Sequence, residues 1–144
     1  MEELARSLAG ERRVLELLLF KLVEAQNLLA ERHDRFYAWA SAELDKVVTL
    51  VRDAELHRAM TINALVADGR TSDRLTLADI AATAPAPFGT ILDDHRSVLR
   101  GLLTEIEARR ELSCDLARTA TTDSQALTAS TCGLSLASLS EFLA

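Results

Sequence analysis

A seam of apolar residues that recurs at alternating steps of three and four is the feature that most constrains how this chain folds. In the stretch from residue 11 to 32 the seam consists of Leu15, Leu18, Leu22, Ala25 and Leu29. Because an α-helix turns once in about 3.6 residues, this spacing places these side chains on one face of a helix. Leu17 and Leu28 widen the face, which is typical of a helix in a bundle. We expect Gly10 to separate this helix from a short N-terminal turn.

Two later stretches carry the same periodicity and predict two more long helices. Over residues 34–68 the apolar positions are Ala40, Leu44, Val47, Val51, Ala54, Ile62 and Leu65. Over residues 88–118 the corresponding positions are Leu92, His95, Leu99, Leu102, Ile106, Leu112 and Leu116. A helix over 34–68 is about 50 Å long, and this length indicates an elongated bundle.

The connections between these helices carry ordinary start and stop signals. His33 and Asp34 form only a weak stop, so one continuous helix is an alternative to the antiparallel hairpin that we favour, in which Asp34 caps the second helix. Gly69 follows the second helix at a position where a left-handed residue is common. Thr76 and Asp79 form a capping-box pattern that predicts a short helix over 77–83.

Together these patterns predict an all-α fold. Residues 1–118 form an elongated, coiled-coil-like antiparallel bundle of three long helices with one short connecting helix. The composition, 49% apolar and 26% charged, fits one ordered domain. The net charge of −6 disfavours a nucleic-acid partner.

The location of the protein is predicted from segments that the sequence lacks. The most apolar run, from Val14 to Val23, is about half of the ~20 residues that cross a bilayer, so stable membrane insertion is not expected. The first residues do not resemble a secretory signal. We therefore expect a cytoplasmic protein.

The residue types that carry catalysis or bind metals are scattered. His33, His57 and His95 stand singly, and no Glu-x-x-His or His-Glu-x-x-His pattern places two ligands on one helix face. We expect no metal, no cofactor and no enzymatic activity. For His95, a role as a core or boundary residue is favoured over a role in a site.

Cysteine and aromatic residues are interpreted as structural. Cys114 and Cys132 stand 18 positions apart, which is about 27 Å along one continuous helix and too far for a disulfide. We expect both to be reduced thiols. Phe36, Tyr37 and Trp39 are interpreted as packing at the end of the hairpin, with an exposed anchor for a partner as the alternative.

The composition changes sharply after Arg118. Ten of the last 26 residues are Ser or Thr and none is basic. Ser and Thr weaken a helix, yet Cys132, Leu136, Leu139 and Leu143 recur at helical spacing. Residues 119–144 are therefore predicted to form a marginal amphipathic segment that leaves an apolar stripe uncovered until a partner protein orders it.

Three stretches carry a resemblance to a known family: RVLELLLFKLVEAQNLLA, DAELHRAMTINALVADG and TLADIAATAPAPFGTILDDHRSVLRGLLTEI. In this order they resemble the FlgN family of flagellar export chaperones, in the form found in high-GC Gram-positive bacteria, over about residues 10–118. The resemblance implies a cytoplasmic type III secretion chaperone that holds hook-filament junction proteins unassembled and delivers them to the export gate.

The resemblance also implies that the client binds the C-terminal region. The residues expected to contact it are Leu116, Leu127, Leu134, Leu136, Leu139, Phe142 and Leu143. The alternative is a helical adaptor that self-associates through the same stripe. A chaperone of this kind is expected to be a monomer when free, and an adaptor a stable dimer.

Overall fold

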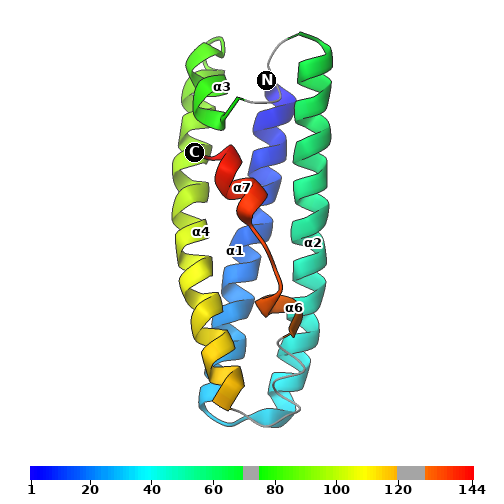
Figure 1. The fold of residues 1–144 in the computed structure, drawn as a ribbon, viewed down its shortest axis with the longest axis vertical. Coiled ribbons are helices and arrows are strands. Elements are labelled where there is room, and N and C mark those ends of the chain that lie inside the picture. Colours follow the sequence, from blue (N-terminus) through cyan, green and yellow to red (C-terminus); the bar gives the residue numbers. More distant parts are fainter. Residues whose placement is uncertain (70–74, 120–128) are drawn as a thin grey trace.

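Three long helices run the length of the molecule, as the computed structural model shows (Figure 1). The structure describes residues 1–69, 75–119 and 129–144. The long helices are α1 (Glu2–Ala30), α2 (Asp34–Ala67) and α4 (Phe88–Thr119), with the short α3 (Leu77–Thr83) before α4. Helix α1 packs against both α2 and α4, and α3 packs against α4. The predicted all-α bundle is confirmed.

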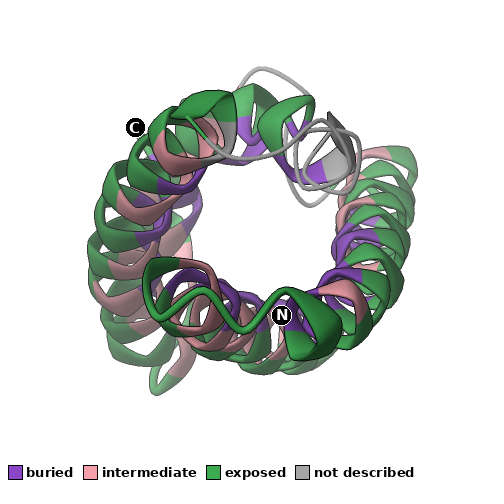
Figure 2. Cartoon of the chain, turned by 90° about the horizontal axis from the view of Figure 1, so that it is seen from below, coloured by how far each residue is buried: buried purple, intermediate pink, exposed green. Residues whose placement is uncertain are grey.

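The C-terminal part of the chain completes the bundle. After α6 (Ala129–Cys132) and α7 (Ala137–Phe142), the chain ends on the side of the molecule between α2 and α4 (Figure 1). It runs antiparallel to α4. Seen along the bundle axis, the buried stretches face the middle and the exposed ones face outward (Figure 2). The segment therefore serves as a fourth, short member of the bundle.

The first helix is longer than the sequence indicated. It begins at Glu2 and continues through Gly10, so the predicted N-terminal turn is wrong. Leu4 and Leu8 are fully buried and extend the apolar seam by two turns. Their burial stabilises the helix by more than the roughly 1 kcal/mol that a glycine costs in a helix interior.

The turn between α1 and α2 separates two helices, as the favoured interpretation predicted. Arg32 has a φ of 60°, which reverses the chain. The N-cap of α2 is His33, and Asp34 is the first helical residue, so the predicted capping role of Asp34 is wrong. Gly69 has a φ of 67° after the end of α2, as expected.

The connector from α3 to α4 follows the sequence pattern. The capping box is present: the Asp79 amide donates to Thr76 Oγ1 at 3.3 Å, and the Thr76 amide donates to Asp79 Oδ2 at 3.0 Å. Near the start of α4, a Cβ placed on Gly89 would lie 2.9 Å from the Ala81 carbonyl oxygen. Gly89 thus permits the close approach of α3 to α4.

This contact predicts opposite effects for two glycines of one helix. Gly89→Ala is expected to lower the free energy of unfolding by about 1–3 kcal/mol, because the methyl group meets a backbone atom that cannot move freely. Gly101→Ala is the matched control, since nothing lies within 4 Å of its Cβ position. It is expected to stabilise α4 by about 0.5–1 kcal/mol. Urea unfolding followed by circular dichroism measures both, and equal effects would contradict the contact.

Candidate helix-binding groove

The side of the bundle between α2 and α4 holds residues 129–144, which we call the C-terminal segment. The surface that it covers we call the α2/α4 groove. Four leucines of the segment are buried and belong to the same apolar cluster as the seams of the long helices: Leu134, Leu136, Leu139 and Leu143. The expectation that the apolar stripe is uncovered is therefore wrong. The apolar stripe packs into the groove because moving apolar side chains from water into an apolar environment lowers the free energy of the folded chain.

The other predicted contact residues are less enclosed. Phe142 is half-buried and packs against the main apolar cluster, and Leu116 is half-buried near the end of α4. Leu127 lies outside the described residues. The structure thus brings five of the predicted side chains, those from Leu134 to Leu143, together in one groove.

Arginines of α4 bind the backbone of the C-terminal segment. Arg96 donates from Nε to the Leu143 carbonyl at 3.0 Å and from Nη2 to the Ala144 carbonyl at 2.7 Å. Arg110 donates to the Leu134 carbonyl. Carbonyls at the end of a helix have no partner within it, and a guanidinium both satisfies them and complements the helix dipole. The Arg96 contacts recognise the C-terminal end of α7, the Arg110 contact lies in the connection before α7, and neither involves a side chain of the segment.

A buried ion pair lies beneath α7. Glu11 of α1 and Arg58 of α2 are 1% and 4% exposed, and Arg58 Nε lies 3.1 Å from Glu11 Oε2. The ring of Phe142 stacks on the Arg58 guanidinium at 5.0 Å and covers the pair. Burial raises the pKa of Glu11, and Arg58 opposes this increase. Burial also raises the pKa of the neighbouring Glu55.

A disulfide between Cys114 and Cys132 joins the C-terminal segment to α4, with a Cα–Cα distance of 6.0 Å. The expectation of two reduced thiols is wrong. The separation of about 27 Å applies to one continuous helix, whereas α4 ends at Thr119 and α6 packs beside α4. Cys132 is exposed and Cys114 is half-buried.

The C-terminal segment does not fill the groove completely. A cavity of about 350 Å³ remains between α7 and α2, bordered by Ile62, Leu75, Ser138 and Phe142. Helix α7, which borders this cavity, has only six residues. A helix with longer side chains or more turns would therefore bury more surface in the same groove.

A second, larger cleft lies at the end of the bundle where α1 begins. It has a volume of about 730 Å³, and Met60, Leu65 and Phe88 are among the residues that line it. At its edge Arg6 pairs with Glu2 at 2.8 Å and with Glu3 at 2.7 Å. Both pairs are exposed and contribute little to stability.

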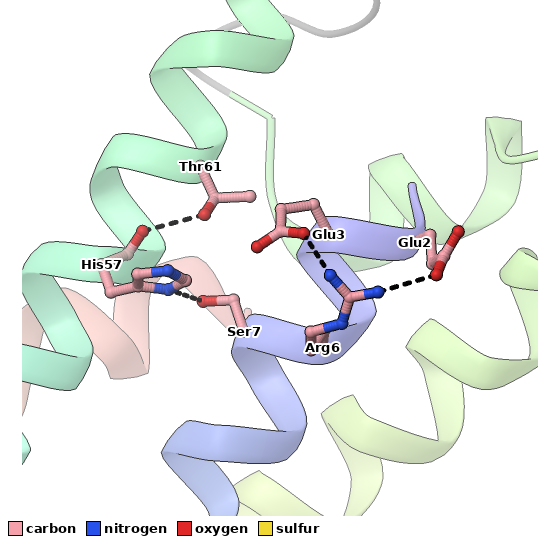
Figure 3. Close-up of polar contacts among 6 residues, drawn as sticks. All are labelled: Glu2, Glu3, Arg6, Ser7, His57 and Thr61. Carbon is pink, nitrogen blue, oxygen red and sulfur yellow. Dashed lines mark hydrogen bonds and ion pairs between the residues drawn. The ribbon is translucent and has the colours of Figure 1, made fainter.

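Ser7 and His57 lie near this cleft and form a contact that could suggest catalysis. Ser7 Oγ is 3.0 Å from His57 Nδ1, and Thr61 donates to the His57 backbone carbonyl (Figure 3). A catalytic serine needs an accessible hydroxyl and a base oriented by a third group. Ser7 is buried and does not line the cleft, and within the described ranges no carboxylate bonds to His57. The contact is therefore best understood as helix packing.

The structure also shows the burial of His95 and of the three aromatic residues near the start of α2. His95 is half-buried, and burial, aided by Arg12, lowers its pKa. Tyr37 is buried at the hairpin end, whereas Phe36 and Trp39 are exposed, Trp39 by 67%. The packing interpretation thus holds for Tyr37 alone.

Among residues 1–69, 75–119 and 129–144, no three His, Cys, Asp or Glu side chains gather where they could hold a metal ion. Within the same ranges, none of the helices combines the length and apolar character needed to span a membrane.

The charged residues of the groove were not among the predicted contact residues, although the sequence carried a signal for two of them. Glu11 and Arg58 occupy positions on the apolar seams of α1 and α2, where a charge is unexpected unless it is paired. Arg96 and Arg110 carried no such signal, because they resemble solvated helix residues.

The chain matches no protein-family model, no curated protein and no solved structure.

Proposed function

We propose that this protein is a chaperone that binds an amphipathic helix of a client protein in the α2/α4 groove, in exchange for its own C-terminal segment. The observation that carries the proposal is the burial of four leucines of this segment at the fourth position of the bundle. A groove that accepts an apolar, weakly charged helix from its own chain has the shape and chemistry to accept a similar helix from another.

The C-terminal segment is well suited to be displaced. Its helix α7 has six residues and no side-chain N-cap, so its intrinsic helical stability is low. Its contacts with Arg96 and Arg110 involve only backbone carbonyls. A client helix that ends beside Arg96 reproduces the Arg96 bonds, and a helix longer than α7 also fills the remaining cavity of about 350 Å³.

The identity of the client follows from the resemblance to flagellar export chaperones. We propose that the clients are hook-filament junction proteins, bound in the cytoplasm before their delivery to the export gate. The chaperone is then a monomer when free, since its own segment covers the apolar groove that would otherwise drive self-association.

The test is capture of purified hook-filament junction proteins from the same genome, measured by calorimetry. The full chain is compared with the variant Leu139→Ser/Leu143→Ser, whose segment binds its groove less tightly. Exchange predicts that the variant binds the client at least tenfold more tightly than the unmodified chain. The matched control is Ser135→Ala/Ser140→Ala, because both serines are exposed and neither borders the cavity beside α7.

Two results would argue against the proposal. Equal affinity for the variant and the unmodified chain means that the client binds elsewhere, and weaker binding means that the leucines themselves contact the client. A stable dimer in light scattering, with no capture of any junction protein, supports the self-associating adaptor instead.

A further inference from the structure

The Cys114–Cys132 disulfide joins the C-terminal segment to α4 and does not join the long helices to one another. It connects the last part of α4 with α6, the first helix of the segment. Helices α2 and α4 both pack on α1. Breaking the bond is therefore expected to leave the packing of α1, α2 and α4 in place and to change how the C-terminal segment is held.

We propose that this disulfide is a redox-controlled staple that sets how readily the C-terminal segment leaves the α2/α4 groove, and so how readily a client enters. The effect on client access rests on the proposed function. The staple itself is a property of the free protein and can be measured without a client.

The chain lengths on the two sides of the disulfide give the size of the effect. With the bond intact, α7 starts five residues after Cys132, which is covalently joined to α4; with the bond broken, the nearest covalent connection to α4 along the chain is Thr119, 18 residues before Ala137. The effective concentration of a tethered segment falls with about the −3/2 power of tether length. Reduction is therefore expected to raise the open fraction of the groove about sevenfold.

The position of Arg110 adds to this control. It binds the Leu134 carbonyl, two residues after Cys132. The disulfide holds this carbonyl beside α4, so the first backbone contact of the segment forms without further ordering of the chain. Once the bond is broken, only the chain beyond Thr119 connects this carbonyl to α4, so the same contact forms at a greater cost in conformational entropy.

The bond is accessible to a thiol reductant. Cys132 is exposed whereas Cys114 is half-buried, so a thiolate of a dithiol reductant attacks Cys132 Sγ. A mixed disulfide forms there, and the Cys114 thiolate leaves and takes up a proton. The second thiol of the reductant then attacks the mixed disulfide, which releases the Cys132 thiol and the oxidised reductant. Two electrons pass from the dithiol to the cystine.

Redox control also explains why a protein that we propose to be cytoplasmic has a disulfide. Lasting structural disulfides are rare in the cytoplasm, and those that occur there are mostly transient or redox-sensing. The dithiol form, with the segment loosely held, is then the form that takes clients. Oxidation locks the segment in the groove and lowers client binding.

The direct test is hydrogen exchange of the full chain, measured by mass spectrometry with and without dithiothreitol. The α7 amides, such as those of Ser140 and Leu143, bond within the segment and exchange when it leaves the groove. Reduction is expected to speed their exchange about sevenfold, while the amides in the middle of α1 stay unchanged. The intact mass, lower by about two hydrogens in the oxidised protein, shows which form is present.

The variant Cys114→Ser/Cys132→Ser separates loss of the bond from other effects of the reductant. Its α7 amides are expected to exchange as fast as those of the reduced protein, and their exchange rate is expected to be the same with and without dithiothreitol. Equal exchange in the oxidised and reduced protein, or a mass that shows no disulfide after air oxidation, overturns the inference. Faster exchange throughout α1 after reduction also overturns it, since the bond would then hold the whole bundle.

A binding measurement keeps this inference separate from the proposed function. Junction-protein affinity is expected to be about sevenfold weaker for the oxidised than for the reduced chain. If neither form binds but exchange responds to reduction, the staple stands and the client assignment fails. If both forms bind equally and exchange does not respond, the chaperone function stands and the staple fails.

Discussion

Replacing Leu139 by alanine is expected to lower the free energy of unfolding by about 2–4 kcal/mol. Its side chain is 0% exposed and belongs to the main apolar cluster, so truncation leaves a space between α7 and the long helices. Urea unfolding of the full chain, followed by circular dichroism at 222 nm, measures the change. The effect is large because a residue that looks terminal in the sequence is central in the bundle.

The matched control is Leu56→Ala on α2. Leu56 is 61% exposed, so its replacement is expected to change the free energy of unfolding by no more than about 0.5 kcal/mol. A Leu139 variant that behaves like this control would show that the C-terminal segment is not held in the groove in solution. The exchange mechanism would then lose its premise, because nothing would have to leave before a client binds.

The long helices were predictable because a single physical rule produces them. An apolar seam of three-and-four spacing has one way to be buried along its length, and the seams over α2 and α4 end within one or two residues of the expected positions. Even the polar positions Arg109 and Ser113, which interrupt the seam of α4, have a structural reason. Both hydrogen-bond to Gln26, a buried residue of α1.

The groove was only half predictable, because its formation depends on contacts between distant parts of the chain. Spacing alone identified Leu136, Leu139 and Leu143 as one apolar stripe. Whether that stripe meets another protein or its own bundle depends on the empty side between α2 and α4, which no local pattern encodes. The disulfide was missed for the same reason, since it depends on the reversal of the chain after Thr119.

Removing the positive charge beneath α7 is expected to have the other large effect. Arg58→Ala leaves the Glu11 carboxylate, 1% exposed, without its ion-pair partner. Loss of one member of a buried pair costs about 3–5 kcal/mol, because the remaining charge is neither hydrated nor neutralised. Urea unfolding at pH 7 measures this loss. The double variant Glu11→Leu/Arg58→Met is the control, and it is expected to recover most of the stability, since it buries no charge.

The pH dependence of the same variant tests the cause. Burial already raises the pKa of Glu11, and Arg58 is the group that opposes this increase, so its removal raises the pKa further. A carboxyl whose pKa is higher in the folded than in the unfolded state stabilises the protein below the unfolded value of about 4.3 and loses that contribution as the pH rises through the folded value. Arg58→Ala is therefore expected to regain stability relative to the unmodified chain as the pH falls from 7 towards 5. A loss that stays constant over this range would mean that the variant is weakened by the missing contact between Arg58 and Phe142, and not by an unpaired charge on Glu11.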